Sequence, residues 1–224
     1  IGDPYENDPS VPFVQMRTAM ALFSIGSIMF ALATLIEMEF SSMAIGMAGI
    51  LLAFDNGLIT QSRFILLDGM MLFFIFGSVY AWTKFRQMRY SPFTMSWWSY
   101  LTLTGLFIAG TVGVKLVGLF TVALIGLACL YDLWELADWK RQMSDKLLLR
   151  HFMARFFTLA VMPVMIYLSL YYVHFALLPN SGLGDSHMSI EFQKTLLGNK
   201  MNGDTRSVYY GQTFRIQNRG EKIY

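Results

Sequence analysis

Residues 18–36 read TAMALFSIGSIMFALATLI, a run without a single charged side chain. Its apolar residues are nearly continuous and do not alternate with polar ones, as they would in a half-buried strand. A helix needs about 20 predominantly apolar residues to cross roughly 30 Å of hydrocarbon. In hydrocarbon the backbone must also satisfy its own hydrogen bonds, which a helix achieves within one segment. The run therefore predicts a membrane-spanning helix.

Five similar runs follow, and together the six predict an all-α polytopic membrane protein. The second run is short and would cross only if the bilayer thins around it or if its polar ends are pulled inward. Pro163, inside the last run, lacks a backbone donor and should bend that helix. The expected spans are Val14–Ile36, Phe40–Phe54, Phe64–Thr83, Trp97–Val114, Leu116–Leu136 and Phe156–Leu178.

The composition agrees with this interpretation. The chain is 55% hydrophobic and only 14% charged, whereas a soluble domain carries roughly 25% charged residues. The net charge of +2 gives no sign of a nucleic-acid partner. Cys129 is the single cysteine, so no disulfide can form within the chain, and we interpret it as a buried packing residue. No cluster has the spacing of metal ligands, and no metal is expected.

Lys and Arg predict the orientation, because cytoplasmic loops carry an excess of both. The opposite face has only isolated cations. The N-terminal stretch, the turns at Asp55 and Val114 and everything after Leu178 are therefore expected in the lumen or outside. The cations of the two loops expected in the cytoplasm are Lys84, Arg86 and Arg89 in one and Lys140, Arg141, Lys146, Arg150 and Arg155 in the other.

Four segments are expected along the chain, which we interpret as a piece of a longer protein. Residues 1–13 would be the remainder of a luminal loop, and residues 14–178 the transmembrane region. Residues 179–206 would form a luminal linker with a short helix from Met188 to Leu197, capped by Ser189. Residues 207–224 begin with a strand-like alternation and would start an extra-membrane β domain.

Charges at a membrane edge are costly and suggest function. Three cations on the non-cytoplasmic face would form an electropositive pocket suited to a lipid phosphate. The clearest case is Gln61-Ser62-Arg63, at the expected start of the third helix, where free N–H groups and a guanidinium fork both favour phosphate. The alternative is an arginine that snorkels to the interface. The charged or ionisable residues near this face are Arg17, Asp55, Arg63, Asp68, Lys115 and His174.

The remaining candidates have simpler alternatives. Arg17 would equally serve as an ordinary boundary arginine. Asp68 would pair with a cation or cap a polar cavity. Lys115 would be a solvated lysine in a tight turn, and His174 a packed interface histidine.

Several short stretches then stand out by their order and spacing over nearly the whole chain. They resemble the protein O-mannosyltransferases, membrane enzymes with a GT-C type of fold. The stretches are Val14–Arg17, Gln61–Asp68, Ser91–Phe93 with Trp97–Trp98, Leu101–Gly105, Val112–Gly118, Tyr172–Phe175, Ser181–Gly182 with Gly184–Asp185, and Met188–Ser189 with Phe192–Gln193.

The resemblance implies a glycosyltransferase that moves mannose from dolichyl phosphate mannose to Ser or Thr hydroxyls of proteins entering the secretory pathway. The reaction would invert the anomeric carbon on the luminal face of the endoplasmic reticulum membrane and would need no cofactor besides the lipid donor. Family members work as dimers of related subunits. The spans would be the family's second to seventh helices, and the tail would enter its luminal MIR domain, a β-trefoil.

The resemblance also assigns residues. Arg17 matches the family's functional arginine at the start of its second helix. The block at residues 61–68, with Gln61, Ser62 and Arg63, matches the donor-phosphate region, and Lys115 and His174 match signature positions.

Two motifs of the family are missing from this chain, and both would lie before Ile1. There the family has an acidic Asp-Glu pair that supplies the presumed catalytic base, followed by a His-Pro-Pro block. Leu183 also stands where a proline is usual. We therefore expect the chain by itself to be inactive.

Two other functions remain as alternatives. A transporter or scramblase of an anionic lipid would also use small residues and cations, but it would need polar residues that continue across the membrane. A non-catalytic partner subunit would lack the acidic pair.

Overall fold

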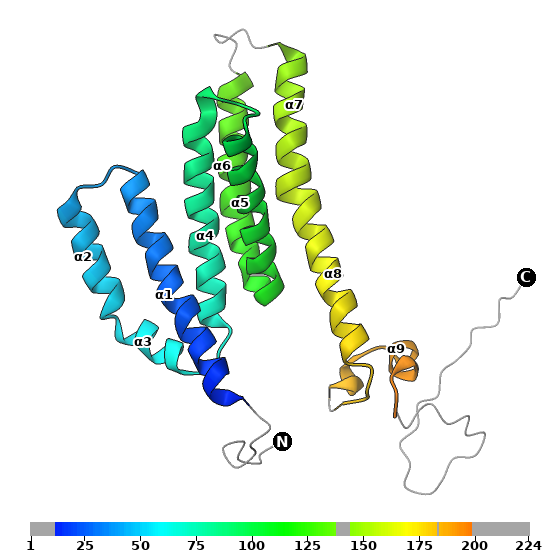
Figure 1. Cartoon of the computed structure of the whole chain (residues 1–224). Coiled ribbons are helices and arrows are strands. Elements are labelled where there is room, and N and C mark those ends of the chain that lie inside the picture. The colour runs from blue at the N-terminus through cyan, green and yellow to red at the C-terminus, as the bar shows by residue number, and fades with distance from the viewer. Residues whose placement is uncertain (1–11, 138–143, 183, 199–224) are drawn as a thin grey trace, which may run out of the picture. The chain divides into compact units, whose positions relative to one another are not determined.

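The computed structural model describes residues 12–137, 144–182 and 184–198. It divides into two compact units, residues 1–171 and 172–224, which are described separately. The first unit is a helical bundle (Figure 1). No β-strand occurs within the described ranges, so the predicted all-α fold of the membrane region is confirmed there.

Helices α1 (Phe13–Glu37) and α4 (Asp68–Gln87) lie side by side in the bundle (Figure 1). Aromatic rings fill the space between them. Phe73 of α4 has its ring centroid 5.2 Å from Phe23 and 5.1 Å from Phe30, both on α1. Such large rings bury much apolar area, which stabilises the pairing of the two helices.

Helix α4 also packs against α5 (Met95–Val114), and α5 packs against α6 (Leu119–Ala137). Helix α7 (Asp145–Phe156) joins them. Cys129 is only 8% exposed and belongs to this core, as predicted. The core is the cluster Trp82, Phe85, Trp97, Leu101, Ile108, Ile125, Cys129 and Ala154.

The segment between α1 and α4 differs from the prediction. It forms α2 (Ser42–Ala53) and a separate short helix, α3 (Asn56–Arg63), bent by 50° from α2. The third spanning helix was predicted to begin at Phe64, directly after Gln61–Arg63. That prediction is wrong, because α3 ends at Arg63 and α4 begins at Asp68.

The physical reason lies in the local sequence. Asp55 accepts a hydrogen bond from the backbone N–H of Leu58 at 2.8 Å, and this N-cap starts α3 independently of α2. Phe64 then takes an extended backbone that ends α3. Between these points the chain is mostly polar, and the extended backbone at Phe64 separates this segment from α4.

Four helices in the described ranges are long and apolar enough to cross a membrane: Phe13–Glu37, Met95–Val114, Leu116–Ala137 and Asp145–Leu177. The bent pair α2 and α3 would make a fifth span. Helix α4 is not among them, with Asp68 at its start and Lys84 and Arg86 in its last turn. It nevertheless corresponds to the third predicted span and packs between α1 and α5.

Many large apolar side chains face outward, which agrees with a lipid environment. Phe120, Leu127 and Trp134 of α6 are 79%, 68% and 78% exposed. Soluble proteins rarely expose contiguous apolar patches of this kind.

The last helix has a local irregularity near Pro163. A π-helical turn, Phe157–Val161, lies between α7 and α8 (Met162–Leu177) and ends two residues before the proline. The helix is nevertheless continuous from Asp145 to Leu177. Gly105 of α5 approaches this turn so closely that a Cβ atom there would lie 2.2 Å from the Thr158 carbonyl oxygen.

In the second unit, α9 (Ile190–Thr195) confirms the predicted short helix in a shorter form. Ser189 accepts a hydrogen bond from the backbone N–H of Phe192 at 3.3 Å, as a capping residue should. The ring of Phe192 packs 5.4 Å from that of Phe175. The predicted strand and β domain after residue 207 lie outside the described residues.

Gly105→Ala should destabilise the bundle by about 1–3 kcal/mol, because the new methyl group would overlap a backbone carbonyl. Gly126→Ala is the matched control, since nothing lies within 4 Å of its Cβ position. That change should be neutral or stabilise α6 by up to about 1 kcal/mol through helix propensity. Unfolding of the detergent-solubilised protein measures both. Equal effects of the two substitutions would contradict the close contact.

Candidate functional site

The helices of the first unit have two ends (Figure 1). At one end α1 and α4 begin, α5 ends and α3 lies, and we call it the Asp68 end. At the other end α1, α4 and α6 end and α5 and α7 begin, and we call it the Asp132 end. The described loops alternate between these ends as the sequence predicted.

Arg17 and Arg63 both belong to elements at the Asp68 end. Arg17, near the start of α1, is exposed, and its guanidinium carbon lies 5.8 Å from the ring centroid of Phe13. Arg63 is exposed at the last position of α3 and forms no ion pair with any residue of the described ranges.

The position of Arg63 corrects the predicted helix-start geometry. Gln61, Ser62 and Arg63 occupy the C-terminal turn of α3, where the backbone offers carbonyl oxygens instead of free N–H groups. The negative end of the helix dipole favours a cation there by about 0.3–1 kcal/mol. Any attraction for phosphate must therefore come from the guanidinium itself.

Lys115 and Asp68 form an ion pair that joins the end of α5 to the start of α4. Asp68 thus pairs with a cation, which was one of its two predicted roles. The side chains of Lys115 and Asp68 are 41% and 26% exposed, so solvent screens their interaction. Because Asp68 neutralises Lys115, Lys115 adds little to the positive potential of this end.

A cavity of about 180 Å³ lies at the Asp68 end between α1, α2, α3 and the start of α4. Gln61 and Ser62 contribute polar atoms to its wall, and most of the other lining residues are apolar. The hydroxyl groups of Ser62 and Ser24 donate to the backbone oxygens of Ile59 and Met20 at 2.8 and 3.1 Å. A mostly apolar cavity with a few polar groups suits an amphiphilic molecule.

Two of the lining residues escaped the sequence analysis. Ser24 and Ser27 of α1 lie along the same cavity wall. Small polar residues at this spacing inside an apolar run were the signal that could have found them.

His174 belongs to the second unit, so the structure does not group it with the cations of the first. Its side chain is exposed, and its ring centroid lies 5.7 Å from that of Phe175 in an edge-on arrangement.

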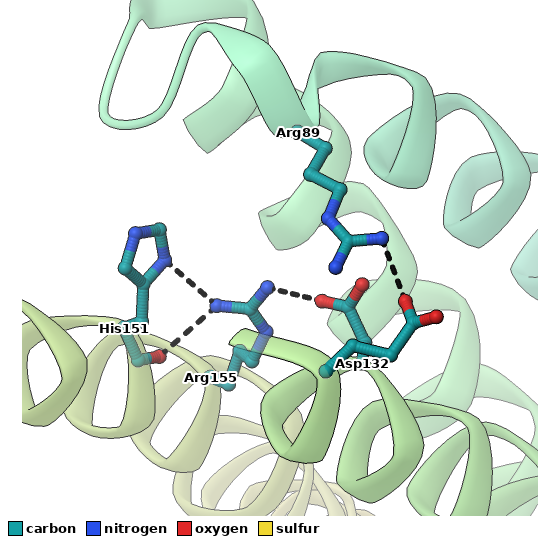
Figure 2. A network of polar contacts seen from close by, with 5 residues as sticks. Arg89, Asp132, His151 and Arg155 are labelled. Carbon is teal, nitrogen blue, oxygen red and sulfur yellow. Dashed lines mark hydrogen bonds and ion pairs between the residues drawn. The ribbon is translucent and has the colours of Figure 1, made fainter. Parts of the chain in front are cut away.

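A different polar cluster lies at the Asp132 end (Figure 2). Arg155 of α7 donates through Nη2 to the Asp132 carboxylate of α6, and the two residues are only 4% and 2% exposed. Arg155 Nη1 also lies 3.0 Å from His151 Nδ1 and donates to the His151 carbonyl at 3.3 Å. Beside them, Arg89 Nη1 pairs with Glu135 at 2.6 Å.

This cluster ties α6, α7 and the segment after α4 together. Three of its buried atoms, Oδ1 of Asp132 and Nε of Arg89 and of Arg155, have no hydrogen-bond partner among the described residues. Sequence reasoning counted Arg155 as an ordinary loop cation and did not single out Asp132. The available signal was an acidic residue inside an otherwise apolar run.

Comparisons with known proteins are specific. A family model described as dolichyl-phosphate-mannose-protein mannosyltransferase matches residues 3–179. Protein O-mannosyl-transferase 2 of Danio rerio is 39% identical over 222 residues, which is 97% of this chain and 28% of that protein. Dolichyl-phosphate-mannose–protein mannosyltransferase 3 of Saccharomyces cerevisiae is 39% identical over 203 residues, 91% of this chain and 27% of that protein.

A solved structure agrees with these matches. The S. cerevisiae protein O-mannosyltransferase Pmt1-Pmt2 complex bound to the sugar donor contains a chain that aligns with a TM-score of 0.78 at 32% identity. The alignment covers 86% of this chain and 26% of that chain. The chain thus spans less than a third of the length of these relatives.

Asp132→Ala should destabilise the bundle by about 3–5 kcal/mol, because it leaves the Arg155 charge buried and unpaired. Asp132→Leu combined with Arg155→Met should recover most of that loss, since no charge is then buried. Asp68→Ala, which breaks the more exposed pair with Lys115, should cost at most about 1 kcal/mol. Denaturant unfolding in detergent measures all three variants. An Asp132→Ala loss no larger than that of Asp68→Ala would contradict this role.

Proposed function

Because the chain belongs to the dolichyl-phosphate-mannose–protein mannosyltransferase family, we propose that it acts in transferring mannose from dolichyl phosphate mannose to Ser or Thr hydroxyls of proteins. The family name identifies the donor and the kind of acceptor. The structural observation that carries the proposal is the Asp68 end, where two arginines lie on elements beside a mostly apolar cavity in a membrane-type bundle.

The reaction makes clear what such an end must provide. The acceptor hydroxyl oxygen forms a bond to C1 of mannose while the bond from C1 to the phosphate oxygen breaks. The electron pair leaves with dolichyl phosphate, and the hydroxyl proton passes to a general base. Negative charge therefore grows on the phosphate in the transition state, where fixed cations stabilise it most.

We assign Arg63 and Arg17 to this departing phosphate. Arg63 has no carboxylate partner in the described ranges, so its guanidinium fork is available for two phosphate oxygens. Gln61 and Ser62, one turn of α3 or less away, line the cavity in which the first part of the lipid tail would lie. Lys115 and Asp68 would hold α4 and α5 beside this site, and His174 stays a candidate by its matching position.

The membrane orientation follows from the same assignment. We place the Asp68 end in the lumen of the endoplasmic reticulum, where secretory polypeptides would supply the hydroxyl groups. The excess of Lys and Arg at the Asp132 end supports this orientation. The matched complex contains two related mannosyltransferases, which supports a dimer with a related subunit.

A lipid transporter or scramblase fits the described residues less well. Buried Ser78 of α4 and Thr104 and Thr111 of α5 donate to backbone oxygens of their own helices. The core around them is apolar. The described ranges therefore show no polar path from one end to the other, which a transporter would need.

Arg63→Ala in the full-length enzyme should lower mannosyl transfer to a Ser/Thr peptide on the order of a hundredfold, because a cation that stabilises the leaving phosphate is lost. Arg63→Lys keeps the charge without the planar fork and should lose less. Arg86→Ala, an exposed arginine of α4 at the opposite end, is the matched control and should leave turnover unchanged.

Turnover per folded molecule separates this role from a structural one. If Arg63 only stabilises the C-terminus of α3, Arg63→Ala lowers the yield of folded enzyme but not its rate, and the assignment to the phosphate fails. If the full-length protein transfers mannose and Arg63→Ala does not change its rate, the proposed reaction stands and only the role of Arg63 is wrong.

A further inference from the structure

A second groove, far along the helices from the candidate donor site, lies at the Asp132 end. It has a volume of about 420 Å³ and runs between the start of α5 and α7. Its walls are mostly apolar, and two cations, Lys146 and Arg150, line it near the start of α7. The apolar lining includes Phe93, Trp98, Leu149, Met153 and Phe157.

The groove has a polar and an apolar part in a fixed order along α7. Lys146, Arg150, Met153 and Phe157 follow one another at intervals of four, three and four residues, which places them on one face of a helix. The cations come first, at the Asp132 end, and the apolar residues follow toward the middle of the bundle. This order matches a lipid, with a charged head group at the membrane edge and an acyl chain below it.

The two cations are available for an anion. Neither Lys146 nor Arg150 forms an ion pair with a residue of the described ranges, and both are exposed. The Arg150 guanidinium carbon lies 4.4 Å from the ring centroid of Phe93. Stacking of this kind fixes the plane of a guanidinium while leaving its edge free to donate.

Phe93 holds an uncommon backbone conformation in the groove wall. Its φ is 62°, in the left-handed region that bulky residues rarely adopt. The ring is fixed by contacts with Trp97 at 5.0 Å and His151 at 4.7 Å between centroids. Strain of this kind persists where surrounding contacts impose it, and it is concentrated at ligand-binding positions.

We propose that this groove binds one anionic phospholipid of the cytoplasmic leaflet, with its phosphate between Lys146 and Arg150 and an acyl chain along Met153 and Phe157. Cytoplasmic leaflets are rich in anionic lipids, and basic pockets between helices on that side recognise their head groups. A soluble acidic peptide would satisfy the cations but not the apolar walls, which continue along a helix long enough to span the membrane. The site is separate from the candidate donor site.

Native mass spectrometry of the full-length protein, released from nanodiscs of mixed phosphatidylserine and phosphatidylcholine, tests the proposal. The two lipids differ in mass, so the spectrum shows which one is retained. One phosphatidylserine should stay bound in preference to phosphatidylcholine. Excess inorganic phosphate should not displace it, because phosphate lacks the acyl chain that the apolar walls hold.

Three variants locate the bound lipid. Arg150→Gln should lower phosphatidylserine retention about fivefold, the attraction expected of one cation near a membrane surface. Arg86→Gln, an exposed arginine at the same end but outside this groove, is the matched control and should change retention little. Met153→Trp fills the groove without changing charge and should lower retention of the lipid as well.

Each contrary outcome overturns the proposal. Equal retention of both lipids would remove the anionic specificity, and equal effects of Arg150→Gln and Arg86→Gln would show diffuse attraction without a site. If another protein segment occupies the groove, Met153→Trp lowers the stability to unfolding and no variant changes lipid retention.

Discussion

Charge in this protein must be paired or kept at the membrane edge, because an isolated ion in hydrocarbon is costly. The structure obeys this constraint at both ends of the bundle. Lys84 pairs with Glu37, Arg89 with Glu135, and Arg155 with Asp132 at one end, while Lys115 pairs with Asp68 at the other. Each pair joins two different helical segments, so the pairing that confines the charges also helps to hold neighbouring helices together.

The two ends use their charges differently. At the Asp132 end the buried ion pair of Asp132 and Arg155 ties α6 to α7 and serves the assembly of the bundle, whereas Lys146 and Arg150 at the same end line the separate groove. At the Asp68 end the one described ion pair is partly exposed, and Arg63 has no carboxylate partner in the described part. A cation without such a partner can respond to charge that appears during a reaction, whereas a paired one is already neutralised.

The break between α2 and α4 connects the fold to the candidate site. If residues 56–68 had continued as one helix, Gln61 and Ser62 would belong to that helix, and no separate segment would form a wall of the cavity. Instead Asp55 caps the short polar helix α3, which closes one side of the cavity beside α1. The donor site that we propose therefore depends on an interruption of the membrane helix, and such interruptions are tolerated where the backbone lines a cavity.

The sequence by itself determined the membrane class, the helical fold and the alternation of the loops, because uninterrupted apolar runs and the positions of Lys and Arg follow from composition along the chain. It also singled out Arg17, Arg63 and Lys115. Only the tertiary structure decided that Arg63 ends a helix, that Lys115 is neutralised by Asp68, and that Asp132 and Arg155 form a buried pair. These facts depend on contacts between residues far apart in sequence, or on a local cap that competes with helix continuation, and neither has a periodic signature in the chain.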